Sequence, residues 1–140
     1  MDIIYKTTAV NHGGRDGEVA VENSPLHFDM ALPPELGGGK ESGANPEQLF
    51  AAGYATCFGS AMQHALRTQK VHTSVPVINL TVGIGKADAG GYQLAVDIVA
   101  VFKGIDQVTA DALLKEAHDV CPYSRATRGN IDVTLKSILV

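Results

Sequence analysis

The sequence has few of the residues on which disulfide-stabilised, zinc-binding or membrane-spanning proteins depend. It contains two cysteines and no tryptophan among 140 residues. Two cysteines are too few for a disulfide scaffold or a four-cysteine zinc site. No apolar run approaches the roughly 20 residues of a membrane span, and none follows a basic start as in a signal peptide. We therefore expect a cytoplasmic protein without a membrane span, in which the cysteines stay thiols and any bond between them is transient.

Positive charge is also scarce in this chain. Lysine and arginine number 11 against 15 acidic residues, and the net charge is −4. This balance argues against a protein that follows the phosphates of a nucleic acid, so we expect no nucleic-acid partner. What the chain does contain is apolar residues, at 45%. That content and the length predict a single domain over residues 1–140.

The first third of the chain has the pattern of short strands joined by turns. Residues 3–10 are rich in β-branched side chains, and residues 18–22 alternate around Val19 and Val21, so each segment predicts a strand. The segment between them, 11–17, contains three glycines and an Asp-Gly pair, which favour the tight loop of a hairpin. A third short strand is expected at 26–30.

The strongest helix signal in the sequence begins at Asn45. Asn45 suits the N-cap, Pro46 suits the first helical position, and Gln48 stands where a capping-box partner is found. The helix is expected to run to Lys70, about six turns. It is almost entirely apolar or small up to His64, and a helix that is apolar all round is buried all round. Because one short subunit does not enclose such a helix alone, we expect a homodimer.

The second half of the chain predicts alternating strands and one further helix. Residues 75–86 and 92–103 alternate with a period of two and form a hairpin. The next helix must end at Cys121, because Pro122 excludes its predecessor from helical geometry. The remaining expected elements are a helix at 109–120, one helical turn at 123–128 and a closing strand at 131–140.

Each cysteine, considered by itself, fits packing in the core as well as it fits chemistry. Cys57 lies in the middle of the long helix, where an apolar site raises the pKa of a thiol and makes it unreactive. For Cys57 to react, the fold must bring a cation to it, and Arg15, Arg125 and Arg128 are the candidates. Cys121 ends a helix beside a proline, where a resolving thiol has the mobility to approach its partner.

Other polar residues also allow more than one interpretation. Arg15, in a glycine-flanked loop, is either a solvated turn residue or a guanidinium that stabilises a thiolate. Glu47, in the first helical turn, is sufficiently explained by the helix dipole. His118 and Cys121 have the H-x-x-C spacing of half a metal site, but no second pair of ligands has matching spacing. We therefore expect no bound metal.

Three motifs occur along the chain in a specific order. They are the glycine-flanked arginine loop GGRDG at 13–17, the helical run NPEQLFAAGYATCF at 45–58, and CPYS at 121–124 followed by ATRGNI at 126–131. Together they resemble the OsmC/Ohr superfamily, and more closely its organic hydroperoxide resistance branch, over essentially the whole chain. One departure is Arg125, where the family usually carries asparagine. The resemblance implies an α+β fold in which antiparallel sheets wrap around a long central helix in an intertwined homodimer.

The same resemblance implies thiol-dependent reduction of organic hydroperoxides, fatty-acid hydroperoxides among them. Cys57 would attack the peroxide and become a sulfenic acid, and Cys121 would resolve it as an intramolecular disulfide. Arg15 would hold the thiolate, and Glu47 would orient Arg15. No cofactor would be bound, because an external dithiol, dihydrolipoamide or the lipoyl group of a lipoylated protein, would reduce the disulfide. Aromatic candidates for the substrate pocket are Phe50, Tyr54, Phe58 and Tyr123.

The spacing of Glu47 and Cys57 limits how these residues can meet. They are ten positions apart in the predicted helix, about 15 Å along its axis, which no carboxylate spans. Either the helix is kinked near Gly53, or Arg15 and Glu47 act on Cys57 of the partner subunit. We favour the second arrangement.

Two other functions remain open at this stage. One is an OsmC-type peroxidase that accepts a broader range of peroxides. The other is a non-catalytic domain that binds a lipid-like ligand in the same apolar pocket. The presence of Cys57, Cys121, Arg15 and Glu47 together argues against the non-catalytic domain.

Overall fold

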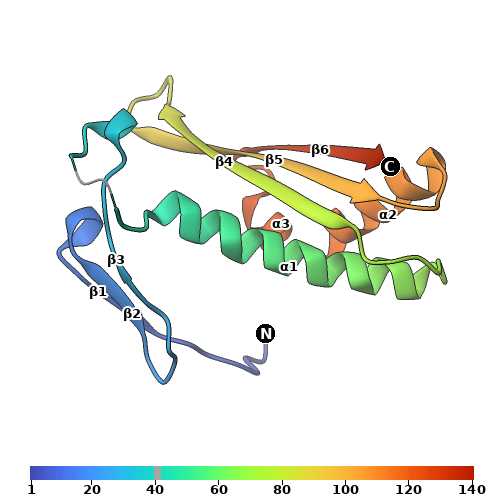
Figure 1. Cartoon of the computed structure of the whole chain (residues 1–140), viewed down its shortest axis with the longest axis horizontal. Coiled ribbons are helices and arrows are strands. Elements are labelled where there is room, and N and C mark those ends of the chain that lie inside the picture. Colours follow the sequence, from blue (N-terminus) through green and yellow to red (C-terminus); the bar gives the residue numbers. More distant parts are fainter. Residues whose placement is uncertain (40–41) are drawn as a thin grey trace. The chain divides into compact units, whose positions relative to one another are not determined.

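The computed structural model of the chain describes residues 1–39 and 42–140 (Figure 1). These residues form two compact units, Met1–Leu49 and Phe50–Val140, and each unit contains a three-stranded sheet. The long helix α1 (Pro46–Thr68) begins at the end of the first unit and continues into the second. Helices and strands are both present in quantity, as the predicted α+β class requires.

The first unit is an antiparallel sheet of three short strands. They follow in the order β1 (Ala9–His12), β2 (Glu18–Val21) and β3 (His27–Asp29). All three predicted strands are present, but the first is shorter than expected. Pairing starts with Ala9 opposite Val21, the last residue of β2, so residues 3–8 extend beyond the end of β2. Two short 3-10 turns complete the unit, η1 (Gly14–Asp16) and η2 (Pro34–Leu36).

The second unit contains a mixed sheet. Its strands lie in the order β4 (Val77–Lys86), β5 (Tyr92–Phe102) and β6 (Asp132–Leu139). β4 and β5 form the predicted antiparallel hairpin, whereas β6 pairs with β5 in parallel. The expectation of purely antiparallel sheets is therefore wrong here. Parallel neighbours need a crossover, and α2 (Gln107–Val120) and α3 (Pro122–Thr127) supply it.

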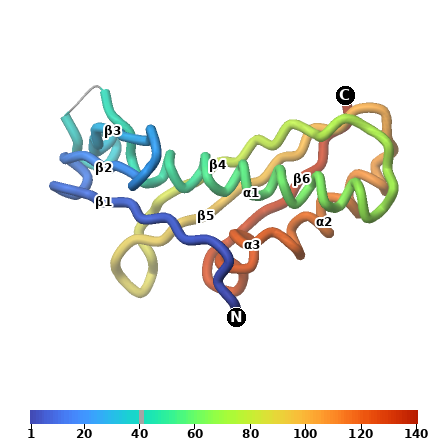
Figure 2. The backbone as a smooth tube through the Cα atoms, turned by 90° about the horizontal axis from the view of Figure 1, so that it is seen from below, coloured from blue at the N-terminus to red at the C-terminus, as the bar shows by residue number. Residues whose placement is uncertain are grey.

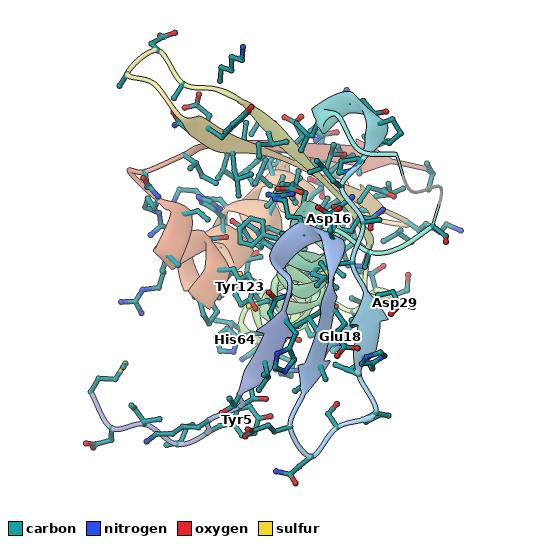
Figure 3. All side chains as sticks on the ribbon, turned by 90° about the vertical axis from the view of Figure 1, so that its left-hand side faces the viewer. Tyr5, Asp16, Glu18, Asp29, His64 and Tyr123 are labelled. Carbon is teal, nitrogen blue, oxygen red and sulfur yellow. The ribbon has the colours of Figure 1, made fainter. Side chains whose placement is uncertain are left out.

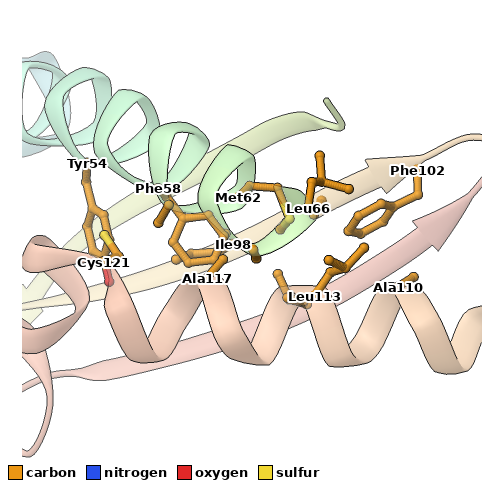
Figure 4. Close-up of a cluster of buried hydrophobic side chains, with 14 of the residues drawn as sticks. Tyr54, Phe58, Met62, Leu66, Ile98, Phe102, Ala110, Leu113, Ala117 and Cys121 are labelled. Atoms are coloured by element: carbon orange, nitrogen blue, oxygen red, sulfur yellow. The ribbon is translucent and has the colours of Figure 1, made fainter. Parts of the chain in front are cut away.

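The core of the second unit lies between the helices and one face of this sheet. Figures 1 and 2 show α1 and α2 on the same side of the sheet, and Figure 4 shows the side chains that fill the space between them. The buried apolar residues come from α1, β5 and α2 and include Tyr54, Phe58, Met62, Leu66, Ile98, Phe102 and Leu113. Burying one such side chain contributes about 2 kcal/mol, so this cluster dominates the stability of the unit.

Within one chain α1 is buried on one face rather than on every side. Its buried residues recur with helical spacing, whereas Ala52, Thr56, Ser60 and Gln63 on another face are exposed. Apart from Gln63, these residues are small, which is why the sequence of this helix looks apolar or small all round. The homodimer expected to cover this face stays a prediction. No helix among residues 1–39 and 42–140 combines the length and apolar character needed to cross a membrane.

Candidate functional site

The structure brings the two cysteines into contact although 64 positions separate them. Sγ of Cys57 in α1 and Sγ of Cys121 are 3.5 Å apart, and both residues are free thiols. Cys121 is fully buried, whereas Cys57 is partly exposed. A disulfide requires about 2.05 Å between the sulfurs. The pair is therefore in non-bonded contact, and an approach of about 1.5 Å would join it.

Cys121 owes its position to the break between α2 and α3. Its backbone has φ −62° and ψ 122°, which ends α2, and its N–H still donates to the carbonyl of Ala117 at 2.9 Å. Pro122 then begins α3, as the sequence predicted, because proline forces its predecessor out of helical geometry. The chain turns at Cys121, and its thiol faces the core beside α1.

The environment of Cys57 within this unit does not activate its thiol. Burial raises the pKa of Cys57, and the neighbouring Cys121 raises it further. The backbone N–H of Tyr123 points to the Cys57 sulfur and acts in the opposite direction. Because burial is the largest effect, the thiol form is favoured. An additional positive charge is needed for a reactive thiolate, as the sequence analysis expects.

A surface cavity of about 450 Å³ opens beside Cys57. It is lined by Cys57, Ser60, Ala61, His64, Val120 and Pro122. Its volume is in the range of small-molecule sites, and its lining is mostly apolar. The partly exposed sulfur of Cys57 is thus at the wall of a hollow that an organic molecule can enter.

The four aromatic pocket candidates contact one another or the core and do not line this cavity. Tyr54 and Phe58 are fully buried. The ring centroid of Tyr123 is 5.6 Å from that of Tyr54 and 6.2 Å from that of Phe50, which it stacks at an interplanar angle of 25°. Gly53 leaves room for this ring, because a Cβ there would be 3.3 Å from Tyr123 Oη. The aromatic residues therefore fix α3 against α1.

Two buried polar residues of α3, the helix that follows Cys121, were not identified from the sequence. Ser124 and Thr127 of α3 are buried, and their hydroxyls are 2.9 Å and 3.3 Å from the buried Tyr54 Oη. The sequence signal for this network is weak, since it consists only of two hydroxyl residues three positions apart in a short helix. Nothing in the sequence shows that Tyr54 faces them.

Arg15 and Glu47 form the ion pair that was expected within the first unit. Arg15 Nη1 donates to Glu47 Oε2 at 2.8 Å and Nη2 donates to Oε1 at 2.6 Å, a bidentate geometry. The pairing raises the pKa of Arg15 and lowers that of Glu47. The guanidinium is thus held in one orientation while part of the side chain stays exposed, at 36%.

Asn11, a residue that the sequence analysis did not single out, fixes the arginine loop. Its amide nitrogen donates to the carbonyls of Gly14 and Glu18 at 3.1 Å and 2.9 Å, and its oxygen accepts from the N–H of Gly14 at 2.9 Å. Gly13 has φ +81°, which favours glycine there. An asparagine three residues before a glycine in a turn was the signal that could have identified it.

The other two arginine candidates are placed differently. Arg128 Nη2 donates to the backbone carbonyl of His118 at 2.8 Å and lies 3.8 Å from Asp119, at the end of α2. Arg125 is exposed on α3. Arg128 is therefore engaged at a helix terminus, while Arg15 is the guanidinium that a carboxylate aligns.

One group of side chains among the described residues has the spacing of a metal site. Glu18, His27 and Asp29 project from β2 and β3, and their ligand atoms lie within 4.8 Å of one another. All three are exposed, and Figure 3 labels Glu18 and Asp29 on these neighbouring strands. Neither cysteine belongs to this group.

Comparisons with known proteins agree with the motif analysis. The family model described as OsmC-like protein matches residues 37–136. The chain is 42% identical over 133 residues to a Staphylococcus epidermidis protein named Organic hydroperoxide resistance protein-like 2, covering 94% of each chain. It is 43% identical over 134 residues to the Organic hydroperoxide resistance protein of Xanthomonas axonopodis pv. citri, covering 95% of this chain and 94% of the relative.

The fold agrees equally well with solved structures. An organic hydroperoxide resistance protein from Elizabethkingia anophelis superposes with a TM-score of 0.94 at 41% identity, and the match covers 100% of both chains. The predicted OsmC/Ohr-like α+β fold is thus confirmed. The chain belongs to the OsmC-like protein family, in its organic hydroperoxide resistance branch.

Proposed function

We propose that this protein is a thiol-dependent peroxidase that reduces organic hydroperoxides to alcohols. The observation that supports this function best is the 3.5 Å contact between Cys57 and Cys121, with Cys57 lining a mostly apolar cavity. Two thiols held in contact can lose two electrons and form a disulfide without a large rearrangement. Relatives named for organic hydroperoxide resistance supply the substrate class.

The first step oxidises Cys57. Its thiolate attacks the distal oxygen of the hydroperoxide, the O–O bond breaks, and the alkoxide leaves and takes up a proton to become the alcohol. The sulfur loses two electrons and becomes a sulfenic acid. The lining of the cavity, with Ala61, Val120 and Pro122, suits an alkyl or aryl group better than a small polar peroxide.

The second step closes the disulfide and the third reopens it. The Cys121 sulfur attacks the sulfenic sulfur of Cys57, the S–O bond breaks, and water leaves. An external dithiol, dihydrolipoamide or the lipoyl group of a lipoylated protein, then exchanges with the disulfide and restores both thiols. No bound cofactor takes part in this cycle.

The first step needs a thiolate, and we assign its stabilisation to Arg15. Burial raises the pKa of Cys57, so the local environment alone leaves the thiol protonated. Arg15 carries the charge that can reverse this, and Glu47 holds its guanidinium through two hydrogen bonds. α1 runs as a helix through Gly53, with Glu47 and Cys57 ten positions apart. We therefore propose a homodimer in which Arg15 acts on Cys57 of the partner subunit.

Thiol titration with cumene hydroperoxide tests this function directly. One equivalent should consume both thiols of the reduced protein and give a Cys57–Cys121 disulfide, detected by peptide mapping. Cys57→Ser should abolish turnover with dihydrolipoamide, whereas Cys121→Ser should still be oxidised at Cys57 but form no intramolecular disulfide. Retained turnover in Cys57→Ser would refute the mechanism.

The same assay separates the alternative functions. A non-catalytic lipid-binding domain would keep both thiols free in the presence of the peroxide. An OsmC-type enzyme of broader range would consume hydrogen peroxide about as efficiently as cumene hydroperoxide. We expect a clear preference for cumene hydroperoxide, because the cavity beside Cys57 is mostly apolar.

A further inference from the structure

A second contact joins the two segments that carry the cysteines. Tyr54 is three residues before Cys57 in α1, and Ser124 is three residues after Cys121 in α3. Tyr54 Oη and Ser124 Oγ are 2.9 Å apart, and both residues are fully buried. The hydroxyl contact therefore links the same two segments that a disulfide would link, one helical turn away from the sulfurs.

The hydroxyl network has one complete arrangement of protons. The single proton of Thr127 Oγ1 is directed at the backbone carbonyls of Tyr123 and Ser124, at 3.1 Å and 3.2 Å. Thr127 therefore accepts from Tyr54 Oη, at 3.3 Å, and Tyr54 in turn accepts from Ser124. Every hydroxyl then donates once, so the buried network is satisfied and α3 has a defined position on α1.

α3 depends on such contacts because the backbone does not fix its direction. At Cys121 the chain is extended, with φ −62° and ψ 122°, so α3 is not a continuation of α2. Pro122 has no N–H with which to extend the hydrogen bonds of α2. The contacts of α3 with α1 include the Tyr54 network, the Tyr123 ring over Gly53 and the stacking of that ring on Phe50.

We propose that Tyr54 is a positioning residue for closure of the Cys57–Cys121 disulfide, which rests on the peroxidase function proposed above. Two reactions compete for the sulfenic acid of Cys57. In one, Cys121 attacks the sulfur, an S–S bond forms and water leaves. In the other, a second hydroperoxide transfers an oxygen, giving a sulfinic acid and an alcohol. Tyr54 holds α3 so that the Cys121 sulfur stays against Cys57, which raises its effective concentration and favours the disulfide.

Tyr54→Phe tests this role because it removes only the phenolic oxygen. We expect disulfide closure to slow about tenfold relative to sulfenic acid formation, since the variant loses both hydrogen bonds of the phenol and leaves Ser124 without its acceptor. The sulfinic fraction at a fixed excess of cumene hydroperoxide should rise by a similar factor. Quenched-flow alkylation followed by intact mass spectrometry resolves thiol, disulfide and sulfinic forms.

Ser124→Ala removes the donor of the same hydrogen bond. It provides the test if Tyr54→Phe does not fold. It should likewise raise the sulfinic fraction relative to the disulfide. The double variant should show little more than the larger single effect, because both substitutions remove one shared interaction. A double variant whose effects multiply would contradict the shared network.

Phe102→Leu is the matched control for general loss of stability. Phe102 is fully buried at the other end of the same core from Tyr54 and Cys121 (Figure 4). Its truncation weakens the core without touching the hydroxyl network, so the ratio of sulfinic to disulfide product should stay at the wild-type value. The proposal is overturned if Tyr54→Phe partitions like the wild type, or if Phe102→Leu gives the same increase. A wild type that forms no disulfide overturns the peroxidase function itself.

Discussion

Two glycines of α1 allow the packing of α3 on this helix to be measured as a free energy. Replacing a glycine inside a helix by alanine stabilises the helix by about 1 kcal/mol. At Gly59 a new Cβ meets no heavy atom of its own chain within 4 Å, so Gly59→Ala should gain this full amount within the subunit. At Gly53 the Cβ would be 3.3 Å from Tyr123 Oη, which is tighter than ordinary contact, and 3.5 Å from Cε2, which is an ordinary contact.

Gly53→Ala must therefore displace the Tyr123 ring by a few tenths of an ångström. Because Tyr123 is 40% exposed, this displacement costs about 1 kcal/mol, at the low end of the range for overpacking, and so cancels the helical gain. We expect Gly53→Ala to be nearly neutral, and about 1 kcal/mol less stable than Gly59→Ala.

Urea unfolding of both variants under reducing conditions gives this difference. Protein concentration must be held constant, because unfolding of a dimer depends on it. Equal stabilisation by the two substitutions would refute the described packing of Tyr123 on Gly53. Destabilisation by Gly59→Ala would instead show that another surface, such as a partner subunit, covers that face of α1.

Three further predictions follow from the ionisable and polar groups. Glu47→Gln should lose at most about 1 kcal/mol of stability near neutral pH. Because pairing lowers the pKa of Glu47, its contribution is present above the unfolded value and is lost as pH falls through the folded value. Urea midpoints of variant and wild type should therefore converge in acid, and a gap that persists there would contradict the ion pair. Burial lowers the pKa of His118 from 6.5, so the native state resists protonation and stability should fall as pH drops below that value. His118→Gln should flatten the dependence of the unfolding free energy on pH, measured by urea titrations. An unchanged dependence would show that His118 does not cause it. Asn11→Ala removes three hydrogen bonds of the arginine loop and should cost about 1 kcal/mol, with slower first oxidation of Cys57 by cumene hydroperoxide. Wild-type oxidation kinetics in this variant would show that the loop needs no such support.

The elements with strong local signals could be predicted from the sequence. The cap at Asn45 and the proline after it place the start of α1 correctly, and Asn45 and Gln48 form the reciprocal capping bonds at 2.9 Å and 3.0 Å. Pro122 places the end of α2 for the same local reason. The hairpin of β4 and β5 follows from alternation and from the glycines between the strands.

Features that depend on distant partners could not be predicted in this way. The parallel pairing of β6 with β5 is decided by the route of the crossover, to which the residues of β6 give no clue. The length of β1 depends on where β2 ends rather than on the β-branched residues before Ala9. The 2.9 Å contact of Tyr54 with Ser124 joins positions 70 apart, and only the folded chain brings them together.

The position of Cys121 on the crossover between β5 and β6 links oxidation to chain entropy. A bond between the two cysteines closes a covalent ring across 64 positions, which contains β4, β5 and α2. Closing a ring of this size reduces the entropy of the unfolded chain by the equivalent of about 4 kcal/mol at 25 °C. In the proposed peroxidase cycle the protein would thus pass through a cross-linked form that is harder to unfold, so thermal melting should distinguish the disulfide form from the reduced form.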